Sequence, residues 1–483
     1  MPPAPRSSYQ QAIRASARWA LWGSLVATLA ATAILGRLAR PAAFRLEAAA
    51  IQKDQALWQG IDFEQLPEVK LLQEYVRIDT SHPDPDEVAG AEFLAARLGA
   101  LGVASTIERM GERRANLWAF VEGESPEAIV LHNHIDVEPA ADLEGWRYPP
   151  FGAVVDGPWI YGRGMYDMKS LTVAQLAAVE AVVRSGRKPK RSLLFLATSS
   201  EELGSDTGTR WILARHPELV ARMSAVLTEG GVVEALGPNA VKYWGIEFAQ
   251  KRFGRLELCS SDRGRLESLR SVIFETCKSD PRPAVSAPVR RFLEAYAGTR
   301  GLESYQRLLA EPERLVADPA RFAQLTGFMQ SLFRDEVVAA PVAEEPDGSF
   351  RMLLSVHLLP DSELAPVVAE LLPDWKTFGV GATVPTEAGA RTASPVDHPV
   401  FRSLAESVRA AHPEAPVGPY FLPWTATDSR FFRARGIPSY GFSPFLIAVT
   451  DTLQIGLPNE RMQLPGFVAG VRLYREAVAR LVD

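Results

Sequence analysis

Continuous apolar runs alternate with helical patterns along much of the chain. Three short runs, Ala128 to Leu131, Leu193 to Thr198 and Ala225 to Leu227, are apolar at every or nearly every position, as in strands that are buried on both faces of a sheet. Apolar residues recur with helical spacing over residues 69–76, 92–101 and 170–184. This alternation predicts an α/β fold with a mainly parallel sheet and helices on both faces.

The pattern changes after Lys251. Residues 255–260 and 349–357 alternate between apolar and polar, and helical stretches at 286–296 and 321–333 lie between them. We therefore predict a smaller α+β lid with an antiparallel sheet that is covered on one face. Helical spacing returns at 397–411.

This change of pattern divides the chain. We predict a larger domain made of residues 66–250 and 391–483, interrupted by the lid at residues 251–390. A short helix is predicted from Thr427, with Asp428 as its cap, to Arg435.

The N-terminal part has a different character. Residues 19–36 contain no charged side chain, and as a helix they would span about 27 Å, close to the thickness of a bilayer core. We predict a basic segment at residues 1–18, an uncleaved membrane anchor at 19–36 and a tether at 37–65. The expected location of the globular body is periplasmic, extracellular or lumenal.

Acidic residues and a histidine follow the predicted strands. His134 and Asp136 come directly after the first apolar run, Glu201 and Glu202 after the second, and Glu229 after the third. Because the carboxyl ends of parallel strands meet at one edge of a sheet, we expect these side chains to lie together. Carboxylates with one imidazole suit zinc or a related ion, and one carboxylate is left to act as a base.

Composition excludes several alternatives. The net charge is −6 and no dense basic tract occurs, which disfavours nucleic-acid binding. Two cysteines, Cys259 and Cys277, are too few for a cysteine-rich zinc site, and they are either small core residues or one disulfide. The sequence contains no Gly-x-Ser-x-Gly motif, which would indicate a serine hydrolase.

Several motifs in order resemble the zinc-dependent aminoacylase and carboxypeptidase family, particularly its carboxypeptidase S and N-acyl amino acid hydrolase branch. The motifs are His134-Ile135-Asp136-Val137, Trp146 with Pro150-Phe151, Tyr161-Gly162-Arg163-Gly164 with Asp167-Met168-Lys169, Glu201-Glu202-x-Gly204 and Glu229-Gly230-Gly231. The resemblance runs from about residue 66 to the end. It implies two zinc ions, a lid that often forms a homodimer, and a small-molecule or peptide substrate with a free carboxylate.

The resemblance also implies a role for each site residue. His134 would bind one ion, Asp167 would bridge both ions, and Glu202 and Glu229 would each bind one. Asp136 would orient His134, a role that suits a carboxylate behind a metal-binding imidazole. Glu201 would be the general base.

Two positions depart from the family pattern. The family has a metal-binding histidine shortly before an Asn-Glu pair, but the residues before Asn459-Glu460 include no histidine, and the family's lid histidine is also absent. His357 stands where a lid arginine usually meets the substrate carboxylate. Arg430, in the family's Thr-Asp-x-Arg loop, is expected to hold that carboxylate by a bidentate fork.

Two hypotheses follow. The first is a membrane-anchored metallohydrolase that cleaves the amide of an N-acyl amino acid or a C-terminal peptide bond. The alternative is a non-catalytic descendant that binds a peptide, an acyl amino acid or a protein partner in the same cleft.

Overall fold

The computed structural model describes the chain from Gly60 onward with short gaps. The described ranges are 60–140, 143–235, 241–279, 283–299, 309–372, 374–382, 386–388, 393–447, 449–452 and 454–483. Within them, no helix is both long and apolar enough to cross a membrane. The predicted basic segment, the anchor at 19–36 and almost all of the tether lie outside the described residues, so these remain predictions.

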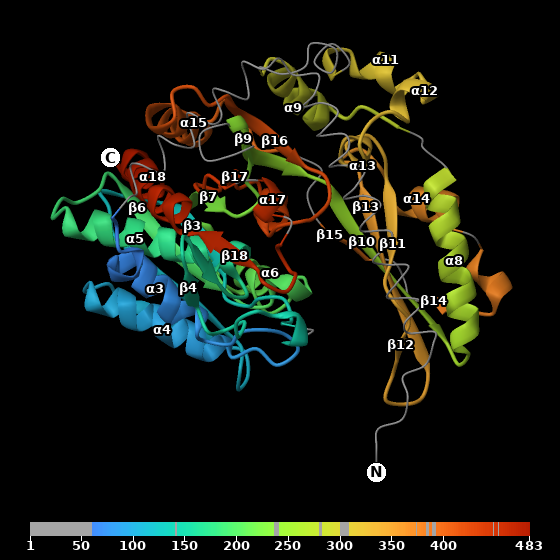
Figure 1. The fold of residues 1–483 in the computed structure, drawn as a ribbon, viewed down its shortest axis with the longest axis horizontal. Helices are drawn as coiled ribbons and strands as arrows, with labels where there is room; N and C mark the ends of the chain where they lie inside the picture. Colours follow the sequence, from blue (N-terminus) through green and yellow to red (C-terminus); the bar gives the residue numbers. More distant parts are fainter. Residues whose placement is uncertain are drawn as a thin grey trace. The chain divides into compact units, whose positions relative to one another are not determined.

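A mixed sheet with a parallel centre organises the larger part of the structure (Figure 1). Among the described residues its nine strands run in the order β1-β2-β6-β3-β7-β17-β9-β16, and β8 pairs with β9. The strands are β1 (Ser105–Arg109), β2 (Ala115–Val121), β3 (Ser125–His134), β6 (Arg191–Thr198), β7 (Met223–Thr228), β8 (Val232–Ala235), β9 (Val241–Gln250), β16 (Val417–Leu422) and β17 (Ser439–Gly441). Strands β6, β3, β7 and β17 are parallel neighbours, whereas β1, β2 and β8 pair antiparallel.

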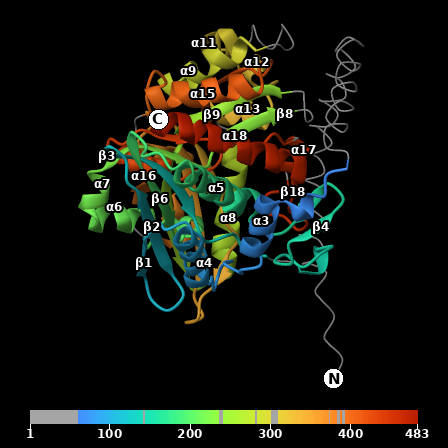
Figure 2. The same cartoon turned by 90° about the vertical axis from the view of Figure 1, so that its left-hand side faces the viewer.

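Helices cover both faces of this sheet, as predicted. On one face lie α3 (Pro67–Val76), α4 (Glu87–Ala100), α5 (Ser170–Arg184), α15 (Pro399–Ala411) and α18 (Leu464–Val482), and on the other α6 (Thr209–Arg215), α7 (Pro217–Val220) and α16 (Ser429–Ala434). Helix α18 packs against both α5 and α15 (Figure 2).

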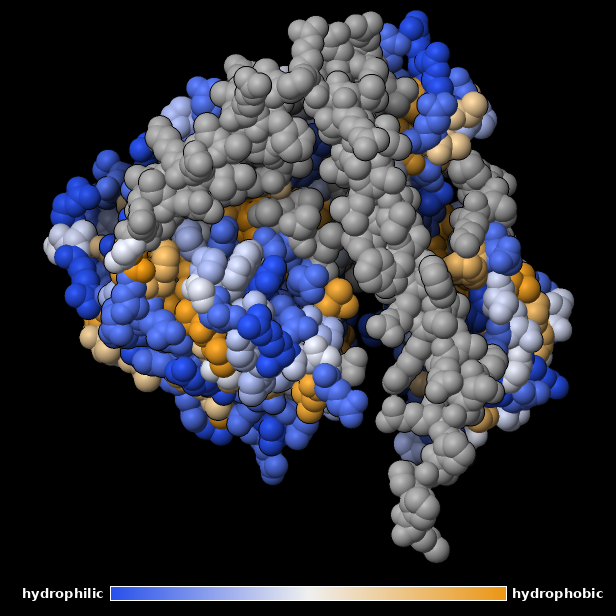
Figure 3. All heavy atoms as spheres, viewed as in Figure 1, coloured by the Kyte–Doolittle hydropathy of each residue, from blue (hydrophilic) through white to orange (hydrophobic). Residues whose placement is uncertain are grey.

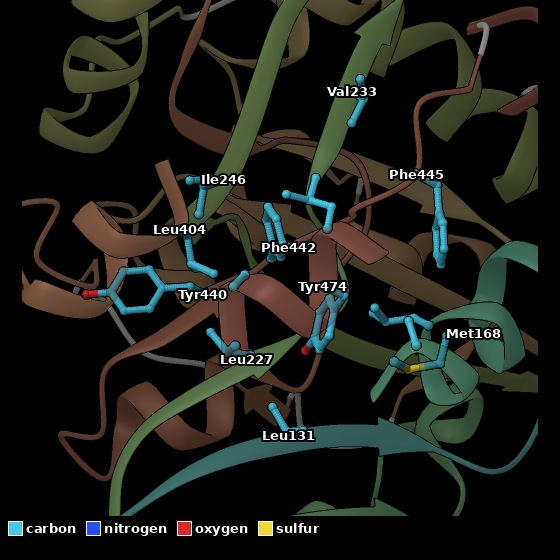
Figure 4. Packing of buried hydrophobic residues seen from close by; sticks show 14 of the residues in the cluster. Leu131, Met168, Leu227, Val233, Ile246, Leu404, Tyr440, Phe442, Phe445 and Tyr474 are labelled. Carbon is cyan, nitrogen blue, oxygen red and sulfur yellow. The ribbon is translucent and has the colours of Figure 1, made fainter. Parts of the chain in front are cut away.

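Successive residues of the central strands point to opposite faces. In β3, Ile129 and Leu131 join the core under α5 and α18, whereas Ala128 and Val130 join the core under α6 and α16. Figure 4 shows Leu131 in the first core, near Tyr474 of α18. Since both faces are apolar, the strands read as continuous hydrophobic runs.

The lid contains a second, antiparallel sheet with its own core. Within the described residues, β11 (Glu336–Ala339), β13 (Phe350–Leu358), β10 (Arg252–Ser260) and β14 (Gly381–Ala382) are neighbours, with β12 (Ala343–Glu344) on β13 and β15 (Thr386–Ala388) on β10. Helices α8 (Arg263–Ser279) and α14 (Leu364–Leu371) cover one face (Figure 1). The predicted antiparallel sheet covered on one face is therefore present.

The lid range also holds a group of helices that belong to the larger core. These are α9 (Ala287–Ala297), α11 (Pro312–Val316), α12 (Pro319–Phe322) and α13 (Gly327–Ser331). Phe292 of α9 packs its ring 5.0 Å from that of Tyr420 in β16. The predicted single helix over 321–333 is wrong, because Thr326 accepts a hydrogen bond from the Met329 amide and starts a new helix there.

Smaller elements complete the description. They are η1 (Phe63–Gln65), η2 (Leu143–Gly145), β4 (Val154–Asp156), β5 (Trp159–Tyr161), η3 (Met165–Lys169), η4 (Glu201–Leu203), η5 (Trp375–Phe378), α17 (Val449–Thr452) and β18 (Arg461–Gln463). Strands β18, β5 and β4 form a small sheet. Hydrophilic residues cover most of the described surface in Figure 3, with hydrophobic ones scattered among them, as on ordinary globular proteins.

Candidate active site

The carboxyl ends of three neighbouring parallel strands carry the candidate site. His134 is the last residue of β3, Glu201 and Glu202 form η4 shortly after β6, and Glu229 follows β7 directly. Asp167 lies in η3, just before α5. The sheet order therefore brings these side chains to one edge, as the sequence pattern predicts.

His134 lies at the centre of the cluster. It is fully buried, and its Nε2 atom lies 2.9 Å from Asp167 Oδ1 and 3.7 Å from Glu229 Oε2. Two groups of potential ligands share it: His134, Glu201 and Glu229 in one, and His134, Asp167 and Glu202 in the other. In each group the candidate ligand atoms lie within 4.8 Å of one another, so the predicted set is brought together.

Asp136 connects three members of the cluster, in a way that differs in detail from the expected one. The closest acceptor for His134 Nδ1 is the Asp136 carbonyl oxygen, at 2.9 Å, whereas the Asp136 carboxylate is 3.6 Å away. That carboxylate instead accepts hydrogen bonds from the backbone amides of Glu201, at 3.0 Å, and Glu202, at 3.1 Å. Asp136 thus fixes the backbone of η4 as well as the ring of His134.

The site concentrates negative charge in a buried space. Burial, followed by the charge of Asp167, raises the pKa of Glu202 to about 11 and that of Glu229 to about 7. Burial and the charges of Glu229 and Asp428 raise the pKa of Glu201 well above its usual range. All three pKa values are raised because these carboxyl groups crowd together away from water.

A divalent cation fits this donor set. Glu202 Oε1 is buried without a hydrogen-bond partner among the described residues, and a cation would supply the positive charge that the carboxylates lack. His134, Asp167 and Glu229 offer one nitrogen and two oxygen donors, which suits zinc. A second ion would have oxygen donors from Asp167 and Glu202 but no imidazole of its own.

The missing second imidazole is not replaced from elsewhere in the fold. All seven histidines of the chain lie among the described residues. His132 contacts the hydroxyl groups of Thr198, Thr209 and Thr228 and so is the structural neighbour that we expected. Neither group around His134 includes His216, His357, His398 or His412. The remaining histidine is His82, and its nearest carboxylate is Asp136.

Arg430, in α16, acts on the site through its charge. It is 8% exposed, and its Nε atom is buried without a hydrogen-bond partner among the described residues. Its positive charge acts on Glu201 and lowers the pKa of that carboxyl, although burial and the nearby negative charges prevail. Gln250 fixes the preceding loop by hydrogen bonds to both the amide and the carbonyl of Thr427.

The helix that carries Arg430 is held by a buried ion pair. Arg433 contacts both carboxylate oxygens of Glu247 at 2.7 Å. Asp428 occupies the expected N-cap position of α16, but its side chain makes no cap hydrogen bond, and it accepts one from the Ser205 hydroxyl instead. This correction to the predicted cap ties α16 to the loop after η4.

His357 is placed in the lid sheet. It lies opposite Phe253 in β10, with the two rings 4.3 Å apart, and burial together with the charge of Lys251 lowers its pKa to about 4. None of its contacts in the described residues reaches Glu201 or Arg430. Its predicted contact with substrate therefore stays a prediction.

Two features of the site were not found from the sequence. His82 donates into the cluster from the loop between α3 and α4, and Arg163 forms a buried ion pair with Glu460. The only signal for His82 was its position in the polar Ser81-His82-Pro83-Asp84 segment, which reads as a simple helix stop. Arg163 and Glu460 were visible only as members of family motifs.

The chain belongs to the peptidase family M20/M25/M40, whose model matches residues 130–480. It is a metal-dependent hydrolase of that family, and the resemblance stated from its motifs is confirmed. Aminoacylase-1A from Rattus norvegicus is 26% identical over 428 residues, which cover 86% of this chain and 96% of the relative. Aminoacylase-1 from Homo sapiens is 25% identical over 433 residues, with 87% and 96% covered.

A solved structure supports the fold. An M20 family metallo-carboxypeptidase from Sulfolobus solfataricus superposes with a TM-score of 0.62 at 17% sequence identity, covering 86% of this chain and 99% of that one. The predicted fold class, a mainly parallel α/β sheet interrupted by a lid, is thereby confirmed.

Proposed function

We propose that this protein hydrolyses the amide bond of N-acyl amino acids or the C-terminal peptide bond of short peptides, with zinc as its metal. The observation that carries this proposal is the position of Glu201. It is buried, its carboxylate lies within 4.8 Å of the ligand atoms of His134 and Glu229, and the charge of Arg430 in α16 reaches it. A carboxylate that can act as a general base therefore lies beside a set of metal donors, and a cation that can bind a substrate carboxylate acts on it.

In the proposed reaction, water attacks the amide carbon while Glu201 takes its proton. Glu201 then delivers that proton to the nitrogen as the carbon–nitrogen bond breaks, giving a carboxylate and an amine. A bound zinc ion would supply Lewis acidity and lower the pKa of water. His134, Asp167, Glu202 and Glu229 would hold zinc, and Arg430 would bind the free carboxylate of the amino acid.

The comparison with relatives supports the choice of bond. Aminoacylase-1 from two mammals aligns over nearly its whole length with this chain. The family includes carboxypeptidases that share the fold. Both reactions break an amide next to an amino acid that carries a free carboxylate, which is the group that a buried arginine recognises.

Glu201→Gln tests this function. The amide keeps the size of the side chain but cannot accept the proton, so kcat should fall by roughly 10²- to 10⁴-fold on any N-acetyl amino acid or blocked dipeptide that the wild type cleaves. Bound metal should stay at the wild-type level, and the exposed Glu218→Gln serves as the control. Full turnover by Glu201→Gln on every accepted substrate would exclude Glu201 as the base.

We also propose that residues 19–36 anchor the protein in a membrane with the body outside the cytoplasm. The support is the uncharged length of that stretch. Membrane fractions of the full-length protein should retain it through a mild salt wash and release it with detergent. Recovery of the full-length chain in the wash would contradict the anchor.

A homodimer through the lid is proposed as well. In the described part of the lid sheet, β11 is an edge strand and exposes 51% of Val338. Unpaired edges are ready to bind another strand. Val338→Glu should convert a dimer to a monomer in sedimentation analysis, whereas a wild type that sediments as a monomer would contradict the proposal.

A further inference from the structure

The loop that carries His82 is fastened along the residues that directly follow strand β3. The Thr80 hydroxyl donates to the carbonyl of Ile135 at 2.7 Å, and the Val137 amide donates to the Thr80 carbonyl at 3.0 Å. The His82 amide returns a hydrogen bond to the Val137 carbonyl, and Ser81 pairs with Val137 in a parallel bridge. His82 is therefore held by backbone contacts on both sides of Asp136.

In the described part of the chain, the ring of His82 makes one hydrogen bond, and the Glu87 carboxylate lies within 4.8 Å. The Nε2 atom of His82 lies 2.8 Å from Asp136 Oδ2, and the two side chains are 5% and 0% exposed. The other ring nitrogen, Nδ1, is buried and has no hydrogen-bond partner among the described residues. Since the Asp136 carboxylate accepts through Oδ2, the His82 ring must carry a proton on Nε2 to donate.

Among the described residues the Asp136 carboxylate accepts three hydrogen bonds, and the one from His82 comes from a side chain. The other two come from the backbone amides of Glu201 and Glu202. A carboxylate can turn about its bond to the chain unless its oxygens are fixed. The hydrogen bond from His82 restricts that rotation and thereby fixes both amides that depend on it.

We propose that His82 is a positioning residue. It acts through Asp136, which binds the backbone amides of the base Glu201 and the metal ligand Glu202 and so fixes the positions of both. This inference rests on the proposed function for the role of Glu201, but its effect on Glu202 concerns metal binding alone. Groups behind metal ligands typically change metal affinity or activity by 10- to 100-fold when they are removed.

Two substitutions distinguish the hydrogen-bond donor of His82 from the volume of its side chain. His82→Gln places an amide nitrogen near the position of Nε2 and so retains a donor to Asp136. His82→Met fills similar space without a donor. A role in filling space alone would give the two variants the same behaviour, whereas a positioning role through the donor separates them.

The test measures zinc affinity by competition with a chelator, together with kcat and KM. His82→Met should weaken zinc binding and lower kcat by roughly 10- to 100-fold each. Its KM should stay near the wild-type value because Arg430 lies in helix α16, which Asp136 does not hold. His82→Gln should recover most of both losses. His216→Met is the matched control, since His216 contacts two carboxylates, Glu108 and Glu218, away from the site.

Wild-type zinc affinity and kcat in His82→Met would overturn the proposal, as would equal losses in His82→Gln and His82→Met. If His82→Met fails to fold by circular dichroism, His82→Asn replaces it, since its shorter amide does not reach Asp136. Chelator competition needs no substrate. If the wild type binds zinc but cleaves no acyl amino acid or peptide, the proposed function fails while the zinc data still decide the role of His82.

Discussion

Arg163 and Glu460 form a buried ion pair, with 2.7 Å between Nη1 and Oε2, although 297 positions separate them in the chain. Glu460 also accepts from the backbone amide of Tyr166, and Arg163 donates to the carbonyl of Gly456. This pair fastens the segment before Asn459-Glu460 beside the stretch that holds Asp167. The segment in which the family has its last metal-binding histidine is thus held next to the site, but in this chain it contains no histidine.

We therefore predict one tightly bound zinc ion and one weakly bound ion per chain. The first has His134 among its donors, whereas the second has only oxygen donors, which bind zinc less well than imidazole does. Zinc-loaded protein analysed for metal before and after dialysis against a weak chelator should keep about one ion per chain. Two ions retained after dialysis would contradict the prediction.

Returning an imidazole to the loop should restore the second ion. The variant Gln454→His places one before Asn459 at a half-buried position and should retain about two zinc ions after the same dialysis. Leu457→His is the control, since its side chain is 46% exposed on the same loop. A failure of Gln454→His would mean that the loop does not face the metal donors.

Arg430 should control affinity for the free carboxylate of the substrate. Arg430→Met removes a charged, bidentate donor, so KM should rise roughly 10- to 100-fold with a smaller change in kcat. The wild type should also lose most activity on substrates whose carboxylate is converted to an amide. The exposed Arg435→Met, from the end of the same helix, is the control. An unchanged KM in Arg430→Met would place the carboxylate elsewhere.

Metal affinity should rise with pH. In the metal-free protein, burial and then the charge of Asp167 raise the pKa of Glu229 to about 7 and that of Glu202 to about 11, so both hold protons that a metal must displace. Below the pKa of each group, the proton that it must release makes the apparent affinity rise by up to about tenfold per pH unit, so the slope should be steeper between pH 6 and 7 than between pH 7 and 8. Chelator competition at pH 6, 7 and 8 measures the slope, and an affinity that does not change with pH would contradict it.

Glu87 should make the metal-free protein less stable as pH rises. Burial, followed by the charge of Asp136, raises its pKa from 4.5 to about 8. Between these values the folded state keeps a proton that the unfolded state releases, so the free energy of unfolding falls by up to about 1.4 kcal/mol per pH unit. Glu87→Gln keeps an acceptor for the Ser200 amide without ionising.

Urea unfolding at pH 5, 6.5 and 8 measures this effect. Glu87→Gln should gain stability relative to the wild type as pH rises, whereas the exposed Glu64→Gln should follow the wild type. Parallel curves for Glu87→Gln and the wild type would show that Glu87 is ionised in the folded protein.

The elements that were predicted well have patterns that depend only on burial. Helix α5 has the predicted bounds, and β6 extends the predicted strand by a residue or two at its start, because unbroken apolar runs and helical periodicity survive any tertiary arrangement. Strands of three residues, such as β17 and β18, carry too few positions for a period to be detected. Their pairing partners lie far away in the sequence.

The site residues that directly follow strands could be predicted from the sequence. Those that depend on contacts between distant parts of the sequence could not. His134, Glu201, Glu202 and Glu229 follow apolar runs, so the sheet order alone brings them together. His82 stands 54 positions before Asp136, and nothing in its local pattern indicates that a loop will fold back along β3. The choice between the Asp136 carbonyl and carboxylate for His134 depends on ångström-scale geometry, which no pattern encodes.

The position of β17 bears on how the chain is made. This strand, Ser439–Gly441, lies between β7 and β9, whose residues are all synthesised before position 251. While the ribosome adds the next 190 or so residues, the half-built sheet has an open seam beside β7. The residues that donate to the metal are thus synthesised before the last tenth of the chain, which contains β17. During that interval the unpaired strand is a site where chaperones can bind.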